Sequence, residues 1–74
     1  MIRREHFCNR LNELGYRYQR ETDRVYLYKK PGHPAFVTIP RRDLLGADYV
    51  RATLRTCGCS PQDIETFVAT CRVQ

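Results

Sequence analysis

The sequence predicts an α+β domain in which helices cover one face of a three-stranded antiparallel sheet, in the order helix, three strands, helix and a short final helix. Residues 16–39 contain three short runs rich in aromatic and β-branched residues, separated by turn-forming residues, which is typical of strands. The segments on either side repeat apolar residues at helical spacing. Because an amphipathic helix buries its apolar stripe, these helices are expected to lie against the sheet.

Length and charge limit the possible functions. The 74 residues make one domain, residues 1–74, and a chain this short buries only about 60% of the surface that it exposes when unfolded. An enzyme with a deep pocket is therefore not expected. The net charge is +5 at pH 7, and eleven of the thirteen basic residues are arginine. Arginine grips phosphate with two donors, which favours a nucleic-acid partner; a solvated basic surface is the other interpretation.

The first helix is expected over residues 3–14. Gly15 follows it, at a position where a left-handed residue commonly ends a helix. Spacing by three and four residues places four apolar side chains on one stripe. These are Phe7, Cys8, Leu11 and Leu14.

The three strands are expected at residues 16–20, 24–30 and 35–39. The first hairpin contains Asp23 but no glycine, so a loop of three to five residues is expected in place of a tight turn. Pro31 and Gly32 suit the two central positions of a type II turn, because proline fixes φ and glycine accepts a positive φ. His33 is then expected at an exposed loop tip.

Alternation along the second strand places Val25 and Leu27 on one face and Tyr26 and Tyr28 on the other. The pattern does not decide which pair meets the helices. A tyrosine face beside basic side chains would stack bases and hold phosphates, or it would be the amphipathic outer face of a small sheet.

Two helices are expected after the strands. Asp48 is expected to cap a helix over residues 49–57, and Gly58 to end it. Ser60, with Pro61 after it and an acidic residue three positions later, predicts the start of a third helix. Their apolar stripes consist of Val50, Leu54 and Cys57 in the second helix and of Ile64, Phe67, Val68 and Cys71 in the third.

The four cysteines are expected to be reduced thiols. The N-terminus lacks the apolar region of a signal peptide, and no apolar run approaches the roughly 20 residues of a membrane span, so we expect a cytoplasmic protein without a membrane partner. Cys8, Cys57 and Cys71 lie on apolar stripes, and the spacing of Cys57 and Cys59 differs from the C-x-x-C of zinc sites. Neither a metal nor a cofactor is expected.

The predicted order of elements is that of double-stranded-RNA-binding domains, and several residues carry a closer resemblance. They are Leu11-x-x-Leu14-Gly15-Tyr16, Arg20, Tyr28, Val37-Thr38-Ile39-Pro40, Tyr49-x-x-Ala52-Thr53-Leu54-Arg55, Cys57-Gly58-Cys59-Ser60 and Phe67. In order and spacing, over about residues 4–68, the chain resembles the HicA family of small bacterial toxins. The resemblance implies a metal-independent protein that cleaves messenger RNA and is held inactive by a HicB antitoxin.

The chain departs from that family at the catalytic histidine, which stands in a Gly-Ser-His motif at the start of the second strand. Without gaps, the histidine position falls on Val25, with Asp23 and Arg24 in place of Gly-Ser; a slip of one residue places it on Arg24. Cleavage through the ribose 2′-hydroxyl needs a base with a pKa near the working pH, which valine lacks and a permanently protonated arginine cannot supply.

Three hypotheses follow from the sequence. The first is a HicA-like RNA-binding domain with weak or no cleavage activity. The second is an active ribonuclease that uses His33 or His6 as its base. The third is a protein-binding module that docks an acidic partner, such as a HicB-like antitoxin. The residues expected to contact RNA are Arg17, Arg20, Arg24, Lys29, Lys30, Arg41 and Arg42.

Overall fold

A computed structural model describes residues 1–73, which form three helices and two antiparallel sheets. In chain order the elements are β1 (Ile2–Arg3), α1 (Arg4–Glu13), β2 (Arg17–Glu21), β3 (Val25–Lys29), β4 (Val37–Pro40), β5 (Leu44–Leu45), α2 (Ala47–Thr56) and α3 (Pro61–Cys71). The α+β class and the predicted order of a helix, three strands and two helices are confirmed.

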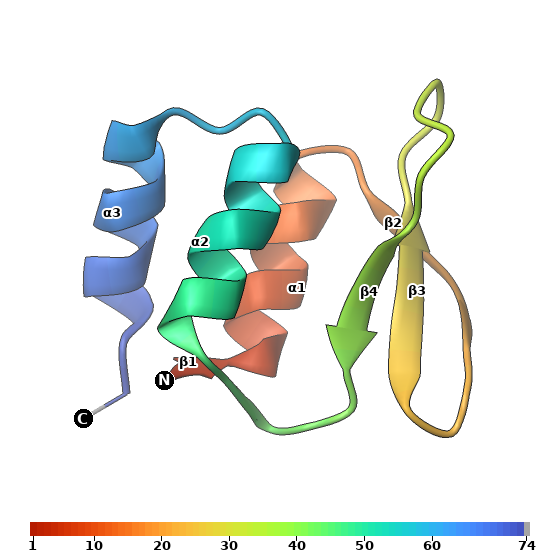
Figure 1. Ribbon diagram of the computed structural model, residues 1–74, viewed down its shortest axis with the longest axis horizontal. Coiled ribbons are helices and arrows are strands. Elements are labelled where there is room, and N and C mark those ends of the chain that lie inside the picture. Colours follow the sequence, from red (N-terminus) through yellow and green to blue (C-terminus); the bar gives the residue numbers. More distant parts are fainter. Residues whose placement is uncertain (74) are drawn as a thin grey trace.

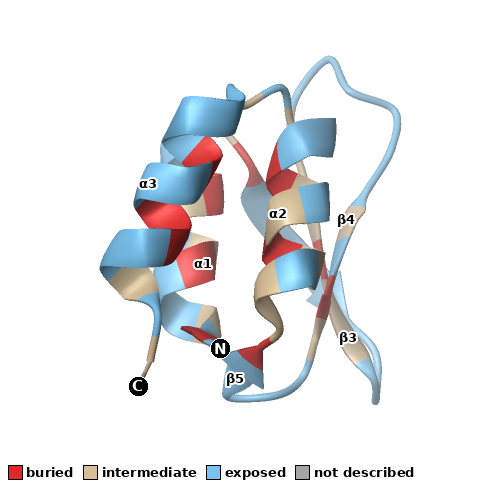
Figure 2. Cartoon of the chain, turned by 60° about the vertical axis from the view of Figure 1, so that its left-hand side comes forward, coloured by how far each residue is buried: buried red, intermediate tan, exposed pale blue. Residues whose placement is uncertain are grey.

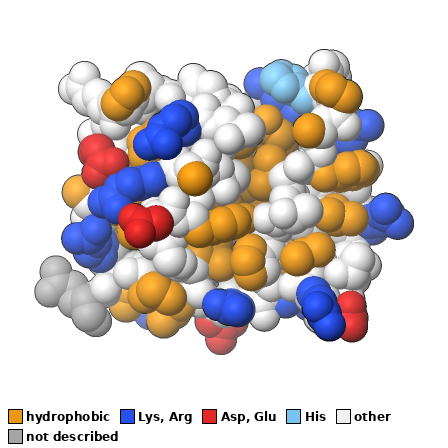
Figure 3. Space-filling view, viewed as in Figure 1, with side chains coloured by type: hydrophobic (Ala, Val, Ile, Leu, Met, Phe, Trp, Pro, Cys, Tyr) orange, Lys and Arg blue, Asp and Glu red, His pale blue; other side chains and the backbone are white. Residues whose placement is uncertain are grey.

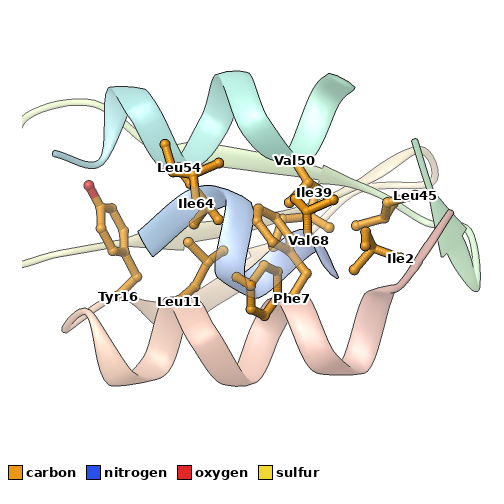
Figure 4. Packing of buried hydrophobic residues seen from close by; sticks show 11 residues of the cluster. Ile2, Phe7, Leu11, Tyr16, Ile39, Leu45, Val50, Leu54, Ile64 and Val68 are labelled. Carbon is orange, nitrogen blue, oxygen red and sulfur yellow. The ribbon is translucent and has the colours of Figure 1, made fainter. Parts of the chain in front are cut away.

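The main sheet has the strand order β2-β3-β4, and it lies on one side of α1 and α2 while α3 lies on the other side (Figure 1). Buried residues lie on the sides of the three helices that face one another (Figure 2). The packed cluster consists of Ile2, Phe7, Leu11, Tyr16, Ile39, Leu45, Val50, Leu54, Ile64, Phe67 and Val68 (Figure 4). Of these residues only Ile39 comes from the main sheet, so the core is mainly a core between helices.

The apolar contacts between the main sheet and the helices come from β3 and β4, whereas β2 is an exposed edge strand. Tyr49 of α2 donates a hydrogen bond to the carbonyl of Thr38 in β4. Tyr26, Tyr28 and Val37 pack against the helical core, whereas all five residues of β2 are exposed. The outer edge of the sheet is therefore a strand that contributes nothing to the core.

Both predicted turns of the sheet are confirmed. Residues 22–24 form the first loop, in which the Thr22 hydroxyl accepts hydrogen bonds from the N–H groups of Arg24 and Val25. In the second connection Gly32 has φ of 86°, and the N–H of His33 donates to the carbonyl of Lys30 at 3.0 Å. These are the features of a type II turn with glycine at its third position.

The predicted end of α1, the predicted start of α3 and the end of α2 at Gly58, which has φ of 90°, are confirmed. Gly15, with φ of 97°, ends α1, and the N–H of Tyr16 donates to the Leu11 carbonyl at 2.9 Å. The Ser60 hydroxyl accepts from the N–H of Asp63 at 3.1 Å and caps α3.

The predicted cap of α2 is wrong. The helix begins at Ala47 after Gly46, and no side chain caps it. The reason is that Leu45 belongs to β5, so the chain turns into the helix directly after that strand. Asp48 lies in the first turn instead, where its carboxylate interacts favourably with the helix dipole, and its Oδ1 accepts a hydrogen bond from Arg51 Nη1 at 3.2 Å.

The small sheet of β1 and β5 was not predicted. Ile2 pairs with Leu45, and both side chains are buried. Ile2 also forms a bridge to Arg72, and the N–H of Val73 donates to the carbonyl of Met1 at 2.7 Å. The two ends of the described chain are thus held together, and Arg3 belongs to this sheet and not to the first helix.

Candidate nucleic-acid interface

Strand register divides the side chains of the main sheet into two faces. The inner face, which turns toward the helices, carries Tyr18, Glu21, Tyr26, Tyr28, Val37 and Ile39, and the outer face carries Arg17, Arg20, Val25, Leu27, Lys29, Thr38 and Pro40. A bulge at Gln19 keeps Tyr18 and Arg20 on opposite faces. The tyrosines of β3 are therefore on the helical side, and the structure does not bring them together with Arg17, Arg20 and Lys29.

A different group surrounds the tyrosines, which we call the arginine–tyrosine cluster: Arg4, Tyr18, Glu21, Tyr26 and Arg41. The guanidinium carbons of Arg4 and Arg41 lie 4.9 Å and 5.2 Å from the centroid of the Tyr26 ring. At these distances each cation is attracted by the electrons of the ring. The predicted list missed Arg4, because helix spacing alone does not reveal that its first residue meets the sheet.

Polar contacts hold this cluster together. The Tyr18 hydroxyl donates to Glu21 Oε1 at 2.9 Å, and Arg41 Nη1 lies 3.0 Å from Glu21 Oε2. Arg41 Nη1 also donates to the carbonyl of Thr22 at 2.7 Å. The hydrogen bond to the Glu21 carboxylate raises the pKa of Tyr18, so the phenol remains a donor.

The seven predicted RNA-contact residues fall into two groups. Arg24, Arg41 and Arg42 lie at the end of the sheet that holds the β2–β3 turn, where the N–H of Arg41 donates to the Arg24 carbonyl at 3.1 Å. Arg20 lies on β2, two residues before that turn. In the described part of the chain, the side chains of Arg20, Arg24 and Arg42 make no hydrogen bond or ion pair.

The other three predicted residues lie at the opposite end and have structural contacts there. Arg17 Nη1 donates to the carbonyls of Asn12 and Tyr16, at 2.7 Å and 2.9 Å, and so covers the C-terminal end of α1. The Nζ of Lys30 lies 5.9 Å from the Tyr16 ring, and that of Lys29 lies 5.4 Å from the Phe36 ring. Their positive charges already have aromatic partners within the fold.

Neither His6 nor His33 lies near the arginines at the β2–β3 end of the sheet. The loop that carries His33 projects from the other end of the sheet (Figure 1). The His33 ring lies 6.3 Å from the Tyr16 ring, and the five residues of β3, which span about 13 Å from the first to the last, separate the two ends.

His6 lines a groove of about 400 Å³ between α1 and α3, together with Arg10, Glu13 and Phe67. At 3.6 residues per turn, His6 points about 200° away from Arg4 around α1.

Val25 is half-buried on the outer face of the sheet, opposite Pro40, and is not part of the helical core. Arg20 is its diagonal neighbour on that face, at the usual separation of about 7–8 Å. The position at which the resemblance to HicA proteins would place a histidine thus carries a hydrocarbon side chain, with the unpaired guanidinium of Arg20 as its diagonal neighbour.

All four cysteines are free thiols and half-buried against the core. Burial and a hydrogen bond with Cys8 raise the pKa of Tyr28 to about 12, and burial and a hydrogen bond with Cys57 do the same for Tyr16. Among residues 1–73, no three His, Cys, Asp or Glu side chains lie close enough together to hold a metal ion. Within the same range, no helix has both the length and the apolar character needed to cross a membrane.

The face seen in Figure 3 has an apolar middle, with Lys and Arg side chains toward its margins.

Comparison of the chain with models of known protein families and with curated protein sequences found no match.

Proposed function

We propose that the protein is a HicA-like RNA-binding domain with weak or no ribonuclease activity. The observation that carries the proposal is the group of arginines at the β2–β3 end of the sheet, of which Arg20, Arg24 and Arg42 have no side-chain partner within residues 1–73. A guanidinium that is not neutralised by the fold is available to bind phosphate in a bidentate manner. The order of helices and strands agrees with the fold that the resemblance implies.

Weak or absent cleavage follows from the surroundings of Val25. Its half-buried hydrocarbon side chain cannot accept a proton from a ribose hydroxyl, and its neighbour Arg20 stays protonated. His33 lies at the far end of β3, and His6 lies in the groove between α1 and α3. The proposal therefore assigns the arginines to binding and no residue to catalysis. It also includes the cytoplasmic location expected from the sequence and the HicB-like antitoxin that the resemblance implies.

Salt dependence of RNA binding tests the role of the arginines. Three phosphate contacts to a single strand predict a slope of log K against log salt of about −2, or about 20-fold weaker binding at 200 mM than at 50 mM salt. Arg24→Ala with Arg42→Ala should reduce the slope by about 1.4. The matched control is Arg55→Ala with Arg72→Ala, which removes two exposed charges away from the sheet. Equal effects of both pairs, or no binding at 20 mM salt, would overturn the proposal.

The loss of cleavage is tested by restoring the base. The unmodified protein is expected to leave a short RNA intact over hours. Val25→His places an imidazole on the outer face beside Arg20, and we expect it to cleave the same RNA slowly, with a pH profile that follows imidazole deprotonation. Robust cleavage by the unmodified protein that His33→Ala abolishes would show an active ribonuclease and contradict the proposal.

A further inference from the structure

Tyr18 is an aromatic residue that the fold exposes. Half of its surface is open to solvent, and every residue of its strand is exposed. Among the described aromatic side chains, Phe36 is the other that is exposed to this degree, and the ammonium of Lys29 lies over its ring. Half of the Tyr18 surface stays in water, so this side chain adds little buried apolar area to the fold.

The Tyr18 ring is nevertheless held in one orientation. Its hydroxyl donates to Glu21, which Arg41 holds from the other side. Its ring makes edge contacts with Tyr26 and Tyr28, with centroids 6.5 Å and 6.1 Å away. A side chain that is already ordered loses little conformational entropy on binding, so a flat ligand can stack on it at low cost.

The surroundings of the ring fit one chemical class of ligand. Arg4 and Arg41 lie on the same side of the sheet as Tyr18. The end of β2, beyond which the unpaired Arg24 lies, is about 10 Å farther along the strand, whereas Arg20 projects from the opposite face. An aromatic platform next to a basic track is the arrangement by which proteins bind unpaired nucleic acid strands. In a duplex the faces of the bases are covered by neighbouring bases, so a duplex cannot stack on this ring.

We infer that the interface takes a single-stranded RNA segment and stacks one of its bases on Tyr18. This inference rests on the proposed function and names the substrate class of the same site. It departs from the duplex binding that the order of helices and strands alone would suggest. The arginines then supply affinity for any phosphate chain, and Tyr18 supplies the preference for an unpaired strand.

The test compares an eight-nucleotide single-stranded RNA with a 12-base-pair RNA hairpin whose loop is a non-nucleotide linker, by fluorescence anisotropy at 50 mM salt. Tyr18→Ala should weaken binding of the single strand about tenfold, which is the usual scale for loss of one stacked base, and leave the hairpin unchanged. The salt slope should stay the same, because no charge is removed. Tyr18→Phe keeps the ring and should retain most of the affinity.

Phe36→Ala is the matched control, since it removes an exposed aromatic ring from the other end of the sheet. It should change single-strand binding less than twofold. Equal affinity for strand and hairpin, with Tyr18→Ala binding like the unmodified protein, would overturn this inference and leave the proposed function standing. Failure to bind either RNA at low salt would overturn the proposed function itself.

Discussion

Replacing the Ile2 side chain by alanine should destabilise the protein strongly, although Ile2 is the second residue of the chain. Its side chain is 0% exposed, and its strand joins both β5 and the segment after α3. Ile2→Ala removes three carbons, worth about 2.4 kcal/mol in transfer free energy, and the cavity left behind brings the expected loss to about 2–5 kcal/mol. A domain of this size has a total stability of only about 4–11 kcal/mol.

Thermal and urea denaturation followed by circular dichroism measure this loss. A change of 1 kcal/mol shifts Tm by about 4–8 °C in a domain of this size, so Ile2→Ala should lower Tm by at least about 8 °C. Leu44→Ala is the control, because it removes an aliphatic side chain from the same small sheet at a partly exposed position. A loss below about 1 kcal/mol for Ile2→Ala, or equal losses for both variants, would refute the placement of β1 in the core.

Two further predictions concern the third helix and alkaline pH. Ser60→Ala removes the acceptor for the Asp63 N–H and should cost about 1 kcal/mol, read from the urea midpoint; a midpoint within error of the unmodified protein would mean that this cap does not stabilise α3. The pKa values of Tyr16 and Tyr28, about 12 against about 10 when unfolded, mean that the folded state keeps two protons that the unfolded state releases. The contribution of these two phenols to the free energy of unfolding should therefore be constant below pH 9 and should fall as pH rises from 10 to 12. Tyr16→Phe with Tyr28→Phe should flatten that decline, and a constant stability up to pH 11.5 in the unmodified protein would contradict it.

Most features that depend on a few neighbouring residues were predicted correctly from the sequence, the cap of α2 being the exception. Gly15 and Gly32 take positive φ because the helix end and the turn require it, and Ser60 caps its helix through a contact three residues away. The three strands and three helices likewise follow from local periodicity. In each case the forces that decide the structure act within one turn or one strand of the residue.

Features that depend on distant partners were not predicted. β1 and β5 have two residues each, too few to show alternation, and they form because Ile2 and Leu45 pair across more than forty residues of chain. The sequence does not decide which face of the sheet carries Tyr26 and Tyr28, because both sides of β3 carry apolar residues. The structure decides it through Ile39, the strand residue opposite Tyr26, which is fully buried among the helices.

The difference between exposed and core-packed strands decides which residues of the proposed interface can change without loss of the fold. Because the core lies between the helices, β2 contributes no buried residue, and Tyr18 and Arg20 project from it into solvent. Substitutions there should alter binding with little effect on stability. On β3 the situation is reversed, since Tyr26 and Tyr28 pack against the core and a change for binding would also weaken the fold. The proposed binding residues on the exposed edge strand can thus change, while the neighbouring strand holds the sheet to the helices.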